Sequence, residues 1–444
     1  MTWRDQWKSL LAIVGGFLLL FFLPVGNARF EQGVREALVL SRWYAREHVL
    51  LCLVPAFFIA GAISTFVSQT SVLKYLGARA NRVVAYGVAG VSGTVIAVCS
   101  CTILPLFTGI YRMGAGIGPA TAFLYSGPAI SVLAIILTGR VLGWEFGAAR
   151  AVAAVGTSVF VGLAMAALFR EEEAEREAQM ALPELPGGRP LWQTATHLAL
   201  LVGILVFANW GKPATDEGLW HSVWAAKWWV TSAFAVGLAA ALVAWFDVAW
   251  WKVTLVAVAT LVAAILTPTL PIVPFVVASL GVGLITSLAE EGSEVEAWFE
   301  ASWDFAKQIM PLLLLGVLAA GALFGSPAMD GLAAREGWIP NEWVARLVGG
   351  ESLSANFLAA ASGAFMYFAT LTEVPILRGL VDSGMGQGPA LALALAGPSL
   401  SLPSILVIYG VLGAKKTAAY VMLCVLASGS LGFLYGQLIA GGAL

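Results

Sequence analysis

The sequence predicts an all-α polytopic membrane protein, with about 10–13 transmembrane helices arranged in two structural repeats. Of its 444 residues, 59% are hydrophobic and 11% are charged, whereas about a quarter of the residues in a soluble domain are charged. Apolar runs long enough to cross a bilayer follow one another along most of the chain. One pattern of Gly and Pro occurs twice in the chain. These observations exclude a water-soluble enzyme.

Net charge and cysteine spacing exclude further classes of protein. The formal net charge is −2 and the Lys and Arg residues are scattered singly, so the sequence has no basic face for nucleic acid. The four cysteines form neither a disulfide framework nor a CxxC zinc motif. No nucleotide-binding fingerprint occurs, and we expect neither an enzyme activity nor a cofactor. Any chemistry with a soft metal or metalloid therefore depends on one close pair, Cys99 and Cys101.

The chain divides into five expected segments. Residues 1–49 hold a first span, or alternatively a signal peptide, and then an amphipathic interfacial helix. Residues 50–168 form the first membrane bundle. Residues 169–191 carry a cluster of glutamates followed by Pro and Gly, which predicts a solvated acidic linker without a functional site. Residues 192–304 form middle spans whose many tryptophans favour the headgroup region, and residues 305–444 form the second bundle.

A repeat without gaps connects the two bundles. Eleven of the 27 residues from Pro105 to Ser131 are identical to the residues 270 positions later, and most of these are Gly, Pro or Ala. Because Gly and Pro determine backbone conformation, they predict the same irregular helix pair in each bundle. Small residues also permit close helix packing without any transport role, but a repeat of this length favours transport. The two repeats are inverted or parallel, depending on the number of spans between them.

The prolines of each repeat predict broken helices. Proline has no amide hydrogen to donate to the carbonyl four residues back, so it leaves that carbonyl free. Free carbonyls persist in a bilayer where they face protein or a wet cavity, and paired discontinuous helices indicate the substrate site of a secondary transporter. Gly118-Pro119 and Gly388-Pro389 predict helix starts with proline in the first turn. The expected helix-break residues are Pro105, Gly127, Pro128, Pro375, Gly397, Pro398 and Pro403.

Cys99 and Cys101 are candidate ligands for a soft centre. In a regular helix, residues two apart point about 200° away from each other, whereas in an extended stretch they share a face. A break ahead of Pro105 would therefore allow both thiols to chelate a trivalent arsenic or antimony species, Cu(I) or Zn. The alternative is that both are small side chains packed in a membrane core.

Glu373 is the conspicuous acid of the second repeat. It lies between Thr372 and Pro375, at the equivalent predicted break. An acid within an apolar segment is a functional candidate by default, because a charge there is costly. We expect Glu373 to couple an ion, with the proton as the first candidate. The alternative is an interfacial Glu373 that pairs with Arg378.

Other polar residues near the predicted breaks complete the candidate site. Ser126, Ser131 and Ser401 flank the Gly-Pro breaks, where their hydroxyls would contact the substrate or bond back to their own helices. Arg112 and Asp382 occupy equivalent positions just before the glycine-rich turns. Both are interfacial in this interpretation, with a possible role in gating or, for Arg112, in attracting an anion.

Three stretches of the chain resemble the ArsP-type permease family. They are VCSCTILPLF at 98–107, GPATAFLYSGPAI at 118–130, and TEVP at 372–375 with AGPSLSLP at 396–403. The resemblance covers about residues 50–170 and 305–438 and leaves the Trp-rich middle without a counterpart. It implies export of trivalent organoarsenicals such as methylarsenite across the bacterial inner membrane, with the thiols of Cys99 and Cys101 at the arsenic site. Ser131 stands where the family pattern has Asn, which puts an amide contact there in doubt.

These observations predict a permease of a bacterial or archaeal cytoplasmic membrane, with broken helices that meet near the midplane around Cys99, Cys101 and Glu373. The first hypothesis is export of a soft, thiol-reactive metalloid compound, driven by protons or by its own gradient. The second is transport of another small solute, such as a soft metal ion or a sulfur-containing anion, with the cysteines incidental. The third is a membrane-embedded structural or dithiol redox subunit.

Overall fold

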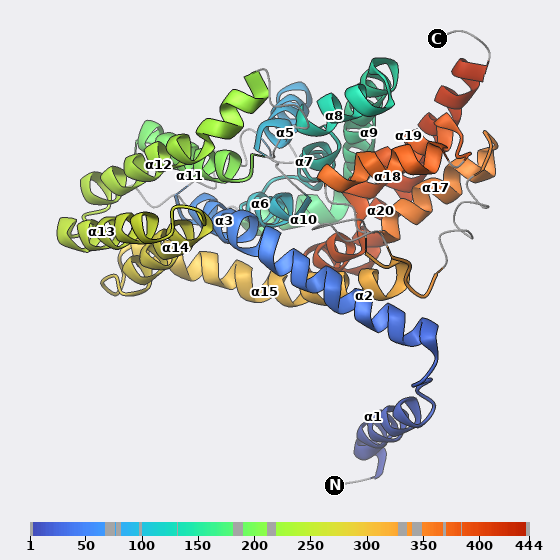
Figure 1. Ribbon diagram of the computed structural model, residues 1–444, viewed down its shortest axis with the longest axis horizontal. Helices are drawn as coiled ribbons and strands as arrows, with labels where there is room; N and C mark the ends of the chain where they lie inside the picture. The colour runs from blue at the N-terminus through green and yellow to red at the C-terminus, as the bar shows by residue number, and fades with distance from the viewer. Residues whose placement is uncertain are drawn as a thin grey trace.

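The computed structural model describes residues 3–66, 76, 81–96, 100–130, 132–180, 190–210, 219–326, 335–339, 349–366, 370–382 and 384–440. Over these residues the chain is built from helices and contains no β-strand (Figure 1). Five of the described helices are long and apolar enough to cross a membrane: Val49–Phe66, Trp144–Leu168, His221–Trp245, Glu294–Phe324 and Leu402–Ile439. The predicted fold class, an all-α polytopic membrane protein, is confirmed.

The N-terminal helices pack along one long helix of the second half. α1 (Trp3–Phe21) extends away from the body (Figure 1). α2 (Ala28–Tyr44) continues through the π-helical η1 (Ala45–Leu53) into α3 (Val54–Phe66), and both α2 and α3 contact α15 (Glu294–Phe324). Gly61 and Gly321 permit this approach, because a Cβ on either residue would come within 3.0 Å of atoms of the facing helix.

The first membrane bundle comprises α5 (Arg82–Ile96), α6 (Ser100–Arg112), α7 (Ile117–Ala129), α8 (Val132–Leu142) and α9 (Trp144–Leu168). α6 and α7 are joined by a tight turn in which Gly114 has a φ of 102°, a conformation that is costly for residues with a side chain. α7 follows the extended Gly116, so that Pro119 lies in its first turn, as predicted.

The second bundle has helices of matching bounds. It comprises α17 (Leu353–Phe365), α18 (Thr370–Asp382), α19 (Gln387–Leu400) and α20 (Leu402–Ala440). The first and last positions of α18 match those of α6 at the offset of the sequence repeat. Gly384, which matches Gly114 at the same offset, has a φ of 101°. Gly143 separates α8 from α9 at a φ of 104°, and Gly413 kinks α20 at a φ of 77°.

Two glycine pairs, at matching positions of the repeat, permit close helix crossings in these bundles. A Cβ on Gly162 of α9 would lie 2.7 Å from the carbonyl oxygen of Gly118 on α7. In the second bundle, a Cβ on Gly432 of α20 would lie 2.6 Å from the carbonyl oxygen of Gly388 on α19. Because these contacts exclude any side chain, they set the same close approach of the two helices in both bundles.

The matching long helices run in opposite directions. The ring of Phe146, near the start of α9, lies 5.8 Å from the ring of Tyr435, near the end of α20. At the other end, the ring of Phe169, which follows α9, lies 5.6 Å from the Lys415 ammonium, just after the α20 kink. α9 and the part of α20 beyond Gly413 are therefore antiparallel.

The middle of the chain supplies α10 (Arg170–Met180), α11 (Leu191–Ala208), α12 (Leu219–Trp245), α13 (Trp250–Leu266) and α14 (Ile272–Ser287). α11 to α14 gather at one end of the molecule (Figure 1). Most of the described side chains of α10 are exposed, in keeping with the expected solvated segment after residue 169, but its Glu173 is 4% exposed. Glu173 pairs there with Lys416 of α20 and with Arg176 of its own helix.

The helix breaks lie beside most of the predicted prolines instead of at them. Pro105 lies inside α6 and Pro375 inside α18, and both helices begin five residues earlier. Proline inside a helix removes one hydrogen bond and crowds the carbonyl four residues back, yet both helices continue past it. Breaks do follow Pro128, between α7 and α8, and Pro398, at Ser401 between α19 and α20. Glu373 is accordingly helical, in the first turn of α18, and does not lie in an unwound stretch.

Candidate functional site

A buried ion pair joins the two halves of the molecule. Nη2 of Arg150, on α9, lies 2.9 Å from Oε2 of Glu373, on α18, and the two side chains are 0% and 1% exposed. Nη1 of Arg150 donates a hydrogen bond of 2.9 Å to Oγ1 of Thr138 on α8. The predicted alternative placed Glu373 at the interface beside Arg378; in the structure Glu373 contacts Arg150, whereas Arg378 is exposed and donates to the Val141 carbonyl.

The ion pair lies off the middle of its helix. Arg150 is six positions after Trp144, so at about 1.5 Å per residue it lies about 9 Å along an α9 that is about 37 Å long. The pair therefore lies nearer the start of α9 than its middle, and α8 and α18, which supply Thr138 and Glu373, also contact each other.

The hydrogen bonding of the pair is incomplete among the described residues. Oε1 of Glu373 and Nε of Arg150 are both buried and have no hydrogen-bond partner there. A guanidinium and a carboxylate usually pair through two parallel hydrogen bonds, and buried polar atoms are normally satisfied. This pair forms one such hydrogen bond. One acceptor, Oε1 of Glu373, and one donor, Nε of Arg150, are left without a described partner at the junction of α9 and α18.

The middle of the bundle holds a second group of buried polar residues. The Tyr125 hydroxyl on α7 donates a hydrogen bond of 3.1 Å to the Leu395 carbonyl on α19. Ser399 of α19 donates to the Tyr125 carbonyl at 3.4 Å. Thr157 of α9 and Ser428 of α20 lie beside the same tyrosine. α7 and α19 thus make polar contacts with each other in the second half of each helix.

The predicted soft-centre ligands fall at the start of α6. Cys99 and Ser131 lie outside the described residues, and Cys101 lies in the first turn of α6, although the position of its side chain is not described. The other two cysteines lie elsewhere, and Cys52 donates a hydrogen bond of 2.7 Å to Asn209. Cys101 and Glu373 therefore occupy the first turns of two helices that match in the repeat.

The predicted hydroxyl ligands are engaged by the protein itself. The Ser126 hydroxyl lies 3.1 Å from the Phe123 carbonyl and 3.3 Å from the Ala89 carbonyl. The Ser401 hydroxyl lies 2.8 Å from that of Ser404. Both serines are buried. The hydroxyls of Ser126 and Ser401 thus have partners within the protein.

The two equivalent charged residues lie at the ends of the short helices, apart from the buried ion pair. Arg112 ends α6, is exposed, and donates a hydrogen bond to Gln308 of α15 while its guanidinium lies 5.1 Å from the Phe305 ring centroid. Asp382 ends α18, and its side chain is outside the described part. Arg112 thus contacts α15.

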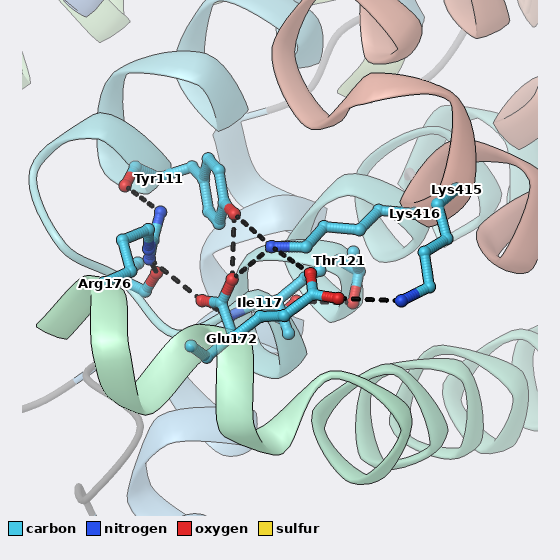
Figure 2. A network of polar contacts seen from close by, with 9 residues as sticks. Tyr111, Ile117, Thr121, Glu172, Arg176, Lys415 and Lys416 are labelled. Carbon is cyan, nitrogen blue, oxygen red and sulfur yellow. Dashed lines mark hydrogen bonds and ion pairs between the residues drawn. The ribbon is translucent and has the colours of Figure 1, made fainter.

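A polar network closes one end of the bundle, and sequence reasoning missed it (Figure 2). Glu173 of α10 accepts a hydrogen bond of 2.9 Å from the Tyr111 hydroxyl, one of 3.1 Å from the Ile117 amide at the start of α7, and one of 2.8 Å from Lys416 of α20. The guanidinium of Arg176 lies 3.1 Å from Glu173 and donates to the carbonyls of the α6–α7 turn. One buried carboxylate thus joins α10, α7 and α20.

The opposite end of the bundle is closed differently. Glu351 accepts a hydrogen bond of 3.0 Å from the Gly388 amide in the first turn of α19, as Glu173 does for α7. Glu173 and Glu351 both stabilise helix N-termini, where the dipole favours negative charge. Glu145, at the position that matches Lys415 in the repeat, lies with Glu351 near Tyr435. One end pairs its acid with lysine and arginine, whereas the other places two acids around a tyrosine.

Arg150 was the most important residue that the sequence reasoning overlooked. It is the sole charged residue between Glu145 and Arg170, and an ionisable residue in such a span is a functional candidate. It lies near the start of the apolar stretch that forms α9, and the sequence analysis did not single it out. The partner, 223 residues away, could not be recognised from the pattern.

Comparison with known proteins shows the family to which this chain belongs. The ArsP_1 family model, described as a predicted permease, matches residues 35–437. The chain belongs to this family. It is 37% identical over 399 residues to a UPF0718 protein of Methanocaldococcus jannaschii, covering 89% of this chain and 94% of that protein. It is 28% identical over 152 residues to the UPF0718 protein YraQ of Escherichia coli, covering 33% and 39% of the two chains. No solved structure matches the chain.

The family match extends beyond the stretches that carry the sequence resemblance. It includes the Trp-rich middle, which the sequence comparison had left without a counterpart. A multi-pass membrane permease, as predicted, agrees with both the family and the five long apolar helices.

Proposed function

We propose that this permease is a secondary-active exporter of a soft, thiol-reactive metalloid compound, a trivalent organoarsenical such as methylarsenite, in a bacterial or archaeal cytoplasmic membrane. The observation that carries the proposal is the buried Arg150–Glu373 pair between α9 and α18. Buried charges inside a membrane bundle are costly and mark ion or substrate pathways.

An inverted repeat supports the transport part of the proposal. The helix bounds and the glycine crossings recur at one constant offset, and the matching long helices α9 and α20 are antiparallel. Inverted repeats with discontinuous helices are the architecture of many secondary transporters, which alternate by moving one repeat against the other. Of the two arrangements that the sequence leaves open, inverted and parallel, we propose the inverted one.

The proposed substrate ligands are the thiols of Cys99 and Cys101, at the start of α6. Soft thiolate ligands select soft centres such as trivalent arsenic. Binding of methylarsenite exchanges its two As–OH bonds for two As–S bonds: each thiol proton leaves with one hydroxide, and two water molecules are released. The oxidation state of arsenic does not change, so the exchange needs no redox partner and reverses when water returns.

Glu373 is the proposed ion-coupling residue, at the matching position of α18. It is buried and has one oxygen without a hydrogen-bond partner among the described residues. A carboxylate in such surroundings can take up and release a proton as access alternates between the two sides. Substrate at α6 and proton at α18 would thus bind to corresponding helices of opposite repeats.

The test is flux in proteoliposomes that contain the full-length protein. With an imposed pH gradient, wild type should move methylarsenite, and Cys99→Ser and Cys101→Ser should each abolish this flux. Cys52→Ser and Cys424→Ser are matched controls, because both lie outside the proposed site, and they should retain it. Unchanged methylarsenite flux in the Cys99 and Cys101 variants would refute the thiol site.

A small sulfur-containing anion is the second candidate, favoured by the buried guanidinium of Arg150. The same liposomes, offered a panel of sulfur oxyanions, separate the two candidates. Flux of an anion that survives both cysteine substitutions, without flux of methylarsenite, would favour the second candidate.

A further inference from the structure

We propose that Arg150 is the resident partner of the coupling site, and that Glu373 binds either the Arg150 guanidinium or a proton in each transport cycle. This inference rests on the proposed function and adds a positioning residue to it. Glu373 carries the proton, whereas Arg150 holds the carboxylate between protons and responds when a proton arrives.

The geometry of the pair suits such an exchange. One hydrogen bond of 2.9 Å joins the two charges, while Oε1 of Glu373 and Nε of Arg150 have no partner among the described residues. A buried pair that only stabilises the fold needs its remaining donors and acceptors satisfied, since desolvation otherwise exceeds the attraction. Here a free oxygen on the acid can accept a proton before the existing bond breaks.

The matching positions of the other repeat show that the fold does not require an ion pair there. The residue 270 positions after Arg150 is Tyr420, and the residue 270 positions before Glu373 is Ile103. Both are buried, at 0% and 1% exposure. The corresponding helices of the other repeat thus pack with uncharged residues at these two positions. The charges of Arg150 and Glu373 therefore serve something other than helix packing.

In the described part of the chain, few other ionisable groups lie on the helices around Glu373. On α9 the neighbours are Arg150 and, five residues earlier, Glu145, which lies near Tyr435. α19 has no ionisable residue, α8 has Arg140, and α18 itself has Arg378, which donates to the Val141 carbonyl, and Asp382 at its end. α7 contributes Tyr125, whose hydroxyl donates to Leu395. Among the described ionisable groups, the one that contacts the Glu373 carboxylate is the Arg150 guanidinium.

The exchange also explains how a proton could drive a movement. When a proton from the aqueous phase binds Glu373, the carboxylate becomes a neutral acid and Arg150 keeps its charge. Arg150 is then a buried cation whose described remaining partner is the Thr138 hydroxyl, a costly state. The protein lowers this cost by moving to a conformation in which Arg150 meets water or an anionic partner, and release of the proton on the other side restores the pair.

The experiment follows the protonation of Glu373 in purified full-length protein, without substrate. Infrared difference spectra over a pH series report the carbonyl band of a protonated carboxylic acid, and the part that disappears in Glu373→Gln belongs to Glu373. In wild type this band should appear reversibly on acidification. In Arg150→Gln it should already be present at a proton concentration at least about tenfold lower, which is a change of one pH unit.

Two further variants keep the test decisive if Arg150→Gln does not fold. Arg150→Lys keeps the charge and should titrate between wild type and Arg150→Gln. The double variant Arg150→Tyr with Glu373→Ile copies the residues of the other repeat, so it should fold, and its flux should no longer depend on pH. Asp304→Asn with Lys307→Gln, a double variant that removes an exposed ion pair of α15, is the control and should behave like wild type.

Three results would overturn the inference. The first is a wild-type Glu373 band that never appears while the protein stays folded. The second is the same titration in the wild type and the Arg150 variants. The third is a double variant that keeps the pH dependence of wild-type flux. If wild type moves no methylarsenite but the Glu373 band behaves as expected, the proposed substrate is wrong and the exchange between Arg150 and the proton stands.

Discussion

The Tyr125 hydroxyl donates a hydrogen bond of 3.1 Å to the carbonyl of Leu395, the residue that lies 270 positions after it. A contact between two matching residues is expected where a pseudo-two-fold axis passes between two halves. The hydrogen bond joins α7 and α19, and almost all residues of these two helices are buried. The two bundles therefore meet on corresponding positions of their most buried helices.

Tyr125→Phe should weaken this contact without creating a large cavity. Loss of one buried hydrogen bond costs about 0.5–1.5 kcal/mol, and the Leu395 carbonyl keeps its place in the helix. Thermal unfolding in detergent should show the decrease. Tyr409→Phe is the control, because Tyr409 is 55% exposed. Equal stability of Tyr125→Phe and wild type would show that the hydroxyl does not hold the two halves together.

Gly162→Ala and Gly432→Ala should both destabilise the protein. Each new Cβ would lie within 2.7 Å of a carbonyl oxygen on the facing helix, and such overpacking costs about 1–3 kcal/mol. Gly156→Ala is the matched control on α9, because no atom lies within 4 Å of its Cβ position. It should instead stabilise the protein by up to about 1 kcal/mol, since Ala favours a helix more than Gly does. Unfolding in detergent decides the signs.

Glu173→Gln should loosen α10 from the bundle. The substitution removes the charge that Lys416 and Arg176 share, and hydrogen bonds to charged groups contribute about 1.5–3 kcal/mol each. Hydrogen exchange of the α10 amides should become faster. Glu172→Gln is the control, since Glu172 is 44% exposed and its lysine partner 79%, and solvent screens such pairs. Equal protection in the two variants would contradict the central role of Glu173.

The pair between Glu172 and Lys415 should give a small pH dependence of stability. The hydrogen bond from Lys415 to the Glu172 carboxyl holds the pKa of this carboxyl below the ordinary value of 4.5. A carboxyl with a lowered pKa in the folded protein adds stability above the unfolded pKa and loses it as the pH falls through the folded pKa. Between pH 7 and pH 3, wild type should therefore lose more stability than Glu172→Gln. Parallel curves for the two proteins would contradict this assignment.

Much of the architecture could be predicted from the chain alone. The large share of apolar residues predicts a polytopic helical protein, because apolar runs of this length and number fit the hydrocarbon core of a bilayer and not a surface exposed to water. The starts of α7 and α19 at Gly-Pro pairs were also predictable, since Pro fits the first turn of a helix and Gly the turn before it. These features depend on local backbone chemistry, which sequence carries directly.

The sequence by itself determined the membrane class, the constant offset of the repeat and the short list of unusual residues, Cys99, Cys101 and Glu373 among them. Tertiary structure alone decided that Glu373 pairs with Arg150 and that Glu173 is buried against Lys416. It also decided that α9 and the end of α20 are antiparallel. The reason is physical: helix periodicity and turn chemistry act between neighbours in the chain, whereas a buried charge finds its partner 223 or 243 residues away through the packing of helices.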